Sequence, residues 1–113
     1  VFPVPGKGLA VVGHYRKGST AQPAGLWVSH SADDGRTWGK AVPITNERLV
    51  EPAVLHAGGR YVGLVRGWRT PAAYFGLTSD DGATWAVDPK GFVAPPPTAG
   101  VGLPSPGLFA DPA

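Results

Sequence analysis

The sequence predicts an all-β chain made of two similar units, each with four short antiparallel strands. Of its 113 residues, 17 are Gly and 13 are Pro, a density that disfavours long helices and favours tight turns. The pattern [Ser/Thr]-x-Asp-Asp-Gly-x-Thr-Trp also occurs twice, at 31–38 and at 78–85. With 42% hydrophobic residues and four Trp, the chain has enough apolar side chain to bury a core.

The first unit covers residues 1–49 and is expected to contain four strands. The sequence Pro-Gly-Lys-Gly at 5–8 is typical of a turn and separates the first strand from the second. The first Asp-Asp-Gly pattern separates the third strand from the fourth. We expect the strands at Val1–Val4, Leu9–Tyr15, Gly25–His30 and Trp38–Val42.

The second unit covers residues 50–101 and repeats this arrangement. Here Gly58-Gly59 takes the place of the first turn and predicts a two-residue hairpin. We expect the strands at Pro52–Leu55, Tyr61–Arg66, Ala73–Leu77 and Trp85–Val87. Pro95–Pro97 is expected in a loop, and residues 102–113 are expected to form the first strand of a third unit.

Composition and charge exclude several classes of function. Ten Lys and Arg against eight Asp and Glu give a net charge of +2 without a basic cluster, so no nucleic-acid partner is expected. No run of about 18 apolar residues occurs, so no membrane span is expected. The chain has no Cys, and its three His show no metal-ligand spacing, so we expect no bound metal and no cofactor. Because the chain begins at Val1 rather than Met, its natural N-terminus is expected upstream.

The distance between the two copies of the pattern predicts the architecture. Asp33 and Asp80 lie 47 residues apart (80 − 33). A period of about 40–50 residues with four strands per repeat is typical of a β-propeller blade. One blade cannot bury both of its faces, and propellers hold about four to eight blades. The remaining blades are therefore expected from the same longer chain or from further copies of this one.

The repeated pattern resembles the Asp box of sialidases and of other BNR-repeat proteins. The matching residues are Ser31, Asp33, Gly35, Thr37 and Trp38 in the first copy, and Thr78, Asp80, Gly82, Thr84 and Trp85 in the second. The resemblance implies a sialidase-like β-propeller, six-bladed if complete, and a secreted or cell-surface protein. In the family these turns lie away from the active site. Asp33 and Asp80 are therefore expected to stabilise their turns by accepting backbone hydrogen bonds.

The second unit also contains a candidate site. If Gly58-Gly59 forms the hairpin turn, residues whose numbers sum to 117 face each other across it. Leu55 then faces Val62, and Glu51 faces Arg66 at the open end of the hairpin. Directly opposed side chains lie within about 5.5 Å at Cβ, so a carboxylate and a guanidinium are expected side by side. A shift of one residue in the turn would break this register.

The resemblance implies roles for this pair. In sialidases, a Glu-Pro at the start of an inner strand is followed by a glycine hairpin and then by a strand-end Arg. The Glu polarises a tyrosine nucleophile, and the Arg is one of three that hold the substrate carboxylate. Glu51 matches that catalytic Glu, and Arg66 matches the substrate-binding Arg, with Arg69 as the alternative if the register differs. A structural ion pair between two strands is the competing interpretation.

The resemblance therefore predicts a segment of an exo-acting, retaining glycoside hydrolase that removes terminal acidic sugars from glycans. The segment alone is expected to be inactive, because the general acid and the nucleophile lie elsewhere. The first unit departs from the family pattern, since Val1-Phe2-Pro3 has no Arg and the loop at 16–25 has no Asp or Glu. The alternative is a non-catalytic BNR-repeat propeller that binds a glycan or a protein partner.

Overall fold

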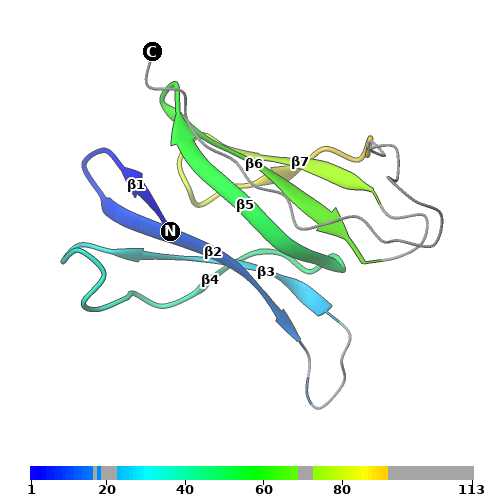
Figure 1. The fold of residues 1–113 in the computed structure, drawn as a ribbon, viewed down its shortest axis with the longest axis horizontal. Helices are drawn as coiled ribbons and strands as arrows, with labels where there is room; N and C mark the ends of the chain where they lie inside the picture. Colours follow the sequence, from blue (N-terminus) through cyan, green and yellow to red (C-terminus); the bar gives the residue numbers. More distant parts are fainter. Residues whose placement is uncertain (17, 19–22, 69–72, 92–113) are drawn as a thin grey trace, which may run out of the picture.

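The computed structural model describes residues 1–16, 18, 23–68 and 73–91, and this part of the chain is all-β (Figure 1). It contains two four-stranded antiparallel sheets, in the strand orders β1-β2-β3-β4 and β5-β6-β7-β8. No helix within the described ranges is long and apolar enough to cross a membrane. Each predicted unit of four strands is thus one sheet of sequentially neighbouring strands, which the tight turns between them favour.

The first sheet follows the prediction except at its last strand. Its strands are β1 (Phe2–Val4), β2 (Gly8–Arg16), β3 (Pro23–Ser31) and β4 (Val42–Thr45). The expected strand at Trp38–Val42 is wrong, because pairing with β3 begins only at Val42, opposite Val28. Before that point, the hydroxyl of Ser29 bonds the carbonyl of Gly39 at 2.6 Å. Gly39 also donates its N–H to the carbonyl of His30 at 2.8 Å, so one backbone bond and one side-chain bond, instead of a continuous ladder, join this segment to β3.

The second sheet contains β5 (Leu49–Ala57), β6 (Arg60–Gly67), β7 (Tyr74–Ser79) and β8 (Ala86–Val87). All four strands overlap their predicted positions, although β5 begins three residues earlier than expected, at Leu49. The predicted boundary between residues 49 and 50 therefore falls inside β5. The predicted loop around Pro95–Pro97 and the predicted strand in 102–113 lie outside the described residues.

The hairpin between β5 and β6 confirms the predicted register over most of its length. Gly58 and Gly59 have φ of 61° and 78°, which suits a type I′ turn and which only Gly adopts readily. Leu55 faces Val62, as the sum rule requires. The register then shifts at the start of β5, where Val50 rather than Glu51 faces Arg66.

The shift in register corrects the expectation that Glu51 and Arg66 are directly opposed. Residues 51 and 52 form an irregularity between the paired positions Val50 and Ala53. Pro52 has no N–H to donate to a ladder, so a bulge at this place loses little. Glu51 has φ of 53°, a left-handed conformation that is uncommon for a residue with a side chain.

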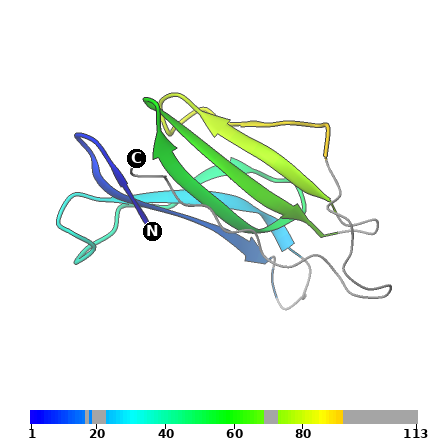
Figure 2. The same cartoon turned by 45° about the horizontal axis from the view of Figure 1, so that its top comes forward.

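The two sheets lie one on the other (Figure 2). Two groups of buried side chains hold them together. One group is Phe2, Val4, Ala10 and Tyr61, and the other is Leu26, Leu49, Val65 and Leu77. Val54 and Trp85 pack against both groups, so they join them. The core therefore lies between the sheets, and its buried side chains come from β1, β2, β3, β5, β6 and β7.

The first motif turn is held by side chains that satisfy its backbone amides. Ser31 is buried, and its hydroxyl donates to Asp33 Oδ1 and accepts from the N–H of Gly35, each at 2.8 Å. Asp33 Oδ1 also accepts from the N–H of Thr37 at 2.8 Å, and Asp33 Oδ2 accepts from the Thr37 hydroxyl. These bonds from Thr37 and Ser31 lower the pKa of Asp33 to about 2.

The second motif turn uses a similar network. The Ser79 hydroxyl donates to Asp81 Oδ1 at 3.2 Å and accepts from the N–H of Gly82 at 2.8 Å. Asp81 Oδ1 also accepts from the N–H groups of Thr84 and Ala83, each at 2.8 Å. These backbone bonds lower the pKa of Asp81.

The expected roles of Thr78 and Asp80 are therefore wrong, since the residues next to them hold the second turn. Strand register explains why Ser79, and not Thr78, takes the role of Ser31. Ser31 faces Leu9 at the start of the second strand of its sheet, and Ser79 faces Tyr61 at the same place in the other sheet. The buried serine ends the strand in both sheets, and the turn that follows is one residue shorter in the second sheet. Asp80 is exposed and pairs with Arg60, with 3.5 Å between Nε and Oδ1.

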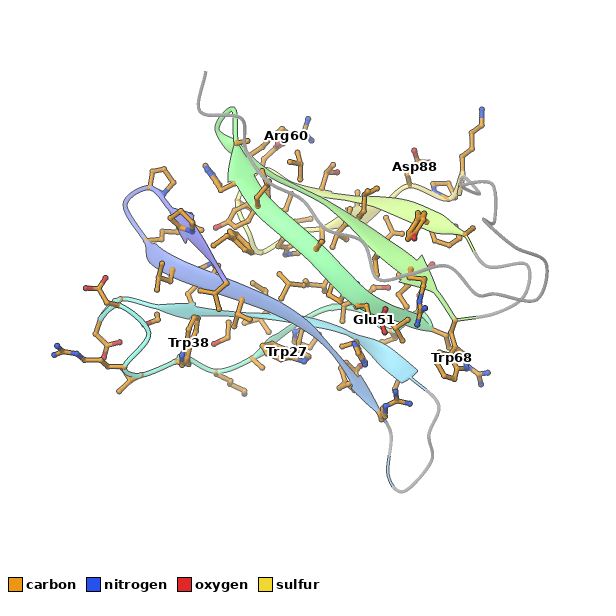
Figure 3. All side chains as sticks on the ribbon, in the orientation of Figure 1. Trp27, Trp38, Glu51, Arg60, Trp68 and Asp88 are labelled. Atoms are coloured by element: carbon orange, nitrogen blue, oxygen red, sulfur yellow. The ribbon has the colours of Figure 1, made fainter. Side chains whose placement is uncertain are left out.

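The two motif tryptophans differ in their surroundings. Trp85 donates its indole N–H to the carbonyl of Gly82 at 2.9 Å, and its ring centroid lies 5.3 Å from that of Tyr61. Trp38 is 39% exposed and lies beside the first sheet (Figure 3). The same residue of the motif thus belongs to the core in one sheet and to the surface in the other.

Candidate functional site

Glu51 and Arg66 form an ion pair despite the shift in register. Arg66 Nη2 lies 3.2 Å from Glu51 Oε1, and the two side chains are 23% and 35% exposed, respectively. Glu51 lies near the start of β5 (Figure 3). Arg66 lies near the end of β6. The contact predicted from the hairpin exists, but it is made through a bulge instead of a regular cross-strand pair.

The backbone of Glu51 is held by the first sheet. Its N–H donates to Nδ1 of His14 on β2 at 3.1 Å. In the neutral imidazole this leaves the ring proton on Nε2, since one nitrogen accepts and the other donates. The left-handed backbone of Glu51 is therefore supported by a hydrogen bond between the sheets, which offsets part of its conformational cost.

His14 is a site residue that sequence reasoning missed, because the spacing of the three His indicates no metal site and suggests no other role. His14 and Glu51 are separated by 37 positions, and neither the motif nor the hairpin rule relates them. The only signal was the position of His14 near the end of the second strand, where side chains of neighbouring sheets meet.

Two further side chains contact each other at the ends of strands. The Arg16 guanidinium lies over the ring of Trp68, 5.7 Å from its centroid. Trp68 follows β6 and lies near the same end of the molecule as Glu51 (Figure 3). Arg69, the alternative substrate-binding arginine, lies outside the described residues.

An open groove of about 350 Å³ lies beside the second sheet. Its lining includes Trp68 and Phe75 together with the charged residues Glu47, Arg48 and Asp88. Neither Glu51 nor Arg66 lines this groove. The ion pair and this groove are therefore separate features, although Trp68 connects the groove with Arg16.

The remaining histidines both contact Tyr61, His30 from the other sheet and His56 from the neighbouring strand of the same sheet. His30 Nε2 lies 3.3 Å from the hydroxyl of Tyr61, and the His56 ring meets the Tyr61 ring edge-on at 5.0 Å. Burial, together with the charge of Lys7, lowers the pKa of His30. Across the described ranges, no three His, Cys, Asp or Glu residues gather in a way that could hold a metal ion.

Comparisons with known proteins found no match: no family, no curated protein and no solved structure is similar enough to this chain. The resemblance to the Asp box therefore rests on the repeated pattern alone. The site is described by its own geometry, which is a partly buried Glu–Arg pair on a strained backbone.

Proposed function

We propose that this chain is a segment of a sialidase-like glycoside hydrolase, and that Glu51 and Arg66 belong to its site for terminal acidic sugars. The observation that carries the proposal is the left-handed backbone of Glu51, with φ of 53°. Strained residues of this kind cluster at functional sites, where the surrounding structure maintains them. A purely structural ion pair would need no such backbone, because a regular cross-strand pair would bring the two groups together.

The chemistry of the pair fits an acidic sugar. A planar guanidinium matches a carboxylate with two parallel hydrogen bonds, so Arg66 would bind the carboxylate of the substrate. Glu51 would accept the proton of a tyrosine hydroxyl as that oxygen bonds to the anomeric carbon. The leaving alcohol would take a proton from a general acid, and water would then release the sugar with retained configuration. The tyrosine and the acid would come from other blades of the propeller.

A second function is favoured by one sequence observation. The loop at 16–25, where the family carries its general acid, contains no Asp or Glu. A propeller without that acid would bind a glycan, or a protein partner, without hydrolysing it. Under either function we propose that the protein acts outside the cell or at its surface.

The two functions are separated by one set of variants in the full-length protein. Glu51→Gln and Arg66→Lys are assayed on a fluorogenic sialoside and, in parallel, for binding of the free acidic sugar. We expect Glu51→Gln to lower kcat by at least about 100-fold and Arg66→Lys mainly to weaken binding. Arg60→Lys is the matched control, because Arg60 pairs with the exposed Asp80. Unchanged turnover in both site variants would contradict the enzyme, and sugar binding without turnover in the unmodified protein would favour the second function.

A further inference from the structure

The two sheets pack with non-equivalent faces in contact, and the strand register identifies these faces. The first sheet covers its neighbour with the face that carries Ala10, Leu26 and Val28, which we call its back face. The second sheet uses the face that carries Tyr61, Val65 and Leu77, which we call its front face. To compare the faces of the two sheets, each residue of one sheet must be matched to its equivalent in the other.

Pairing between neighbouring strands provides that superposition. Leu9 faces Ser31 in the first sheet, and Tyr61 faces Ser79 in the second. Aligned on these pairs, Val65 corresponds to Gly13, Leu77 to Ser29 and Phe75 to Trp27. Successive strand residues point to opposite faces. Gly13, Trp27 and Ser29 therefore form the front face of the first sheet. This face points away from the second sheet.

The front face of the first sheet is open and apolar. A hollow of about 470 Å³ lies there, lined by Val1, Val11, Trp27, Ser29, Trp38, Gly39 and Ala41. The Trp27 ring lies against Gly13, where a Cβ atom would come within 2.5 Å of it. Trp38 is 39% exposed here, whereas its counterpart Trp85 packs in the core between the sheets. The front face of the first sheet is therefore apolar but uncovered, whereas the equivalent face of the second sheet is covered by the first sheet.

The back face of the second sheet is the matching surface. Val62 and Leu64 lie on it and are half-buried. They correspond to Ala10 and Val12 of the first sheet, where Ala10 is buried completely and Val12 packs against the core. The molecule therefore has the open front face of the first sheet on one side. On the other side it has the back face of the second sheet, which is equivalent to the face that the first sheet buries.

We propose that copies of this chain associate head to tail, with the open front face of one copy seated on the back face of the second sheet of the next. Each new contact repeats the interface already present between the two sheets. Such heterologous contacts close into a ring when the rotation per copy permits. Propellers hold about four to eight blades, so a ring would contain about two to four copies. This inference concerns the 113-residue chain by itself and does not rest on the proposed roles of Glu51 and Arg66. In a longer protein, the next blade of the same chain would occupy the front face instead.

The test uses one variant on each face and measures mass in solution by light scattering and sedimentation. Trp38→Glu places a charge on the front face, and Leu64→Glu places one on the back face. Wild-type protein is expected as a discrete oligomer, and each variant alone as a single chain. An equimolar mixture of the two variants is expected to form a one-to-one complex, because each retains the face that the other has lost.

Trp68→Glu is the matched control, since Trp68 is 41% exposed, follows the end of β6 and does not line the hollow on the front face. This variant should keep the wild-type mass, and formation of the mixed complex shows that both face variants are folded. Wild-type protein that sediments as one chain throughout the micromolar range would overturn the proposal. So would a dimer of the Leu64→Glu variant alone, because that result would mean contact between two front faces.

Discussion

The two sheets share one strand order and one turn motif, yet their motif tryptophans have different surroundings. Trp85 packs against both groups of core side chains, while Trp38 remains 39% exposed. Both lie three residues after the motif glycine, Gly82 or Gly35, so their distance from that glycine is not the cause. Among the described residues, only the second sheet has a sheet packed on its front face, and this neighbour accounts for the difference.

The two turns differ in a second respect. Four positions separate Ser31 from Gly35, but only three separate Ser79 from Gly82. The extra residue of the first turn is accommodated by Asp34, which has φ of 59°. The two turns thus reach the same hydrogen-bonded arrangement with different numbers of residues, so the aligned motif does not identify the residue that holds the second turn.

The largest expected effect is a difference in stability loss between the two tryptophan variants. Trp85→Ala should lower the free energy of unfolding by about 3 kcal/mol, because it opens a cavity between the sheets. Trp38→Ala should cost about 1 kcal/mol or less, since the ring is partly solvated already. Urea unfolding of both variants is measured in the Leu64→Glu background, where self-association is blocked. Equal losses for the two tryptophans would contradict the difference in their surroundings.

The next effect concerns the strained backbone of the site. Glu51→Gly should leave the protein about 1 kcal/mol more stable than Glu51→Ala, because Gly accepts φ of 53° without steric cost. Both variants lose the ion pair, so the comparison isolates the backbone. The same two substitutions at the exposed Glu47 serve as the control, and there Gly should be the less stable. Thermal unfolding would contradict the strain if Gly and Ala at position 51 gave equal midpoints.

A smaller effect distinguishes the two aspartates of the second motif. Asp81→Asn should lower the unfolding midpoint, because the carboxylate accepts from two backbone amides and from the Ser79 hydroxyl. Asp80→Asn should leave the midpoint nearly unchanged, since its partner Arg60 lies in solvent. Differential scanning calorimetry of the two variants measures this. A larger loss at position 80 would restore the role that the aligned motif assigns to it.

The smallest effect depends on pH and concerns the first turn. The pKa of Asp33 is about 2 in the folded protein, against 3.8 in an unfolded chain. The folded protein therefore binds the proton less tightly, and the stabilisation by the carboxylate is present above pH 3.8 and is lost as the pH falls towards 2. The midpoint difference between wild type and Asp33→Asn should shrink over that window, with Asp34→Asn as the control. A difference that stays constant down to pH 2 would contradict the assignment.

Much of the fold was predictable because turn chemistry is local. The pair Gly58-Gly59 predicts both the hairpin and its register as far as Ala53, since both positions require positive φ. The start of β4 was not predictable, because the segment before it is joined to β3 by the Ser29 hydroxyl and by one backbone bond between Gly39 and His30 instead of a continuous ladder. The contact between Glu51 and Arg66 was expected, but the bulge that makes it was not.

The sequence by itself determined the two units, the order of their strands and the positions of their turns, since each depends on residues within a few positions of one another. The tertiary structure decided which aspartate holds the second turn, how Glu51 reaches Arg66 and which tryptophan packs against the core. These outcomes depend on residues distant in the chain, such as His14 with Glu51 and Tyr61 with Ser79. Packing of one sheet on another brings such residues together, and no local pattern records it.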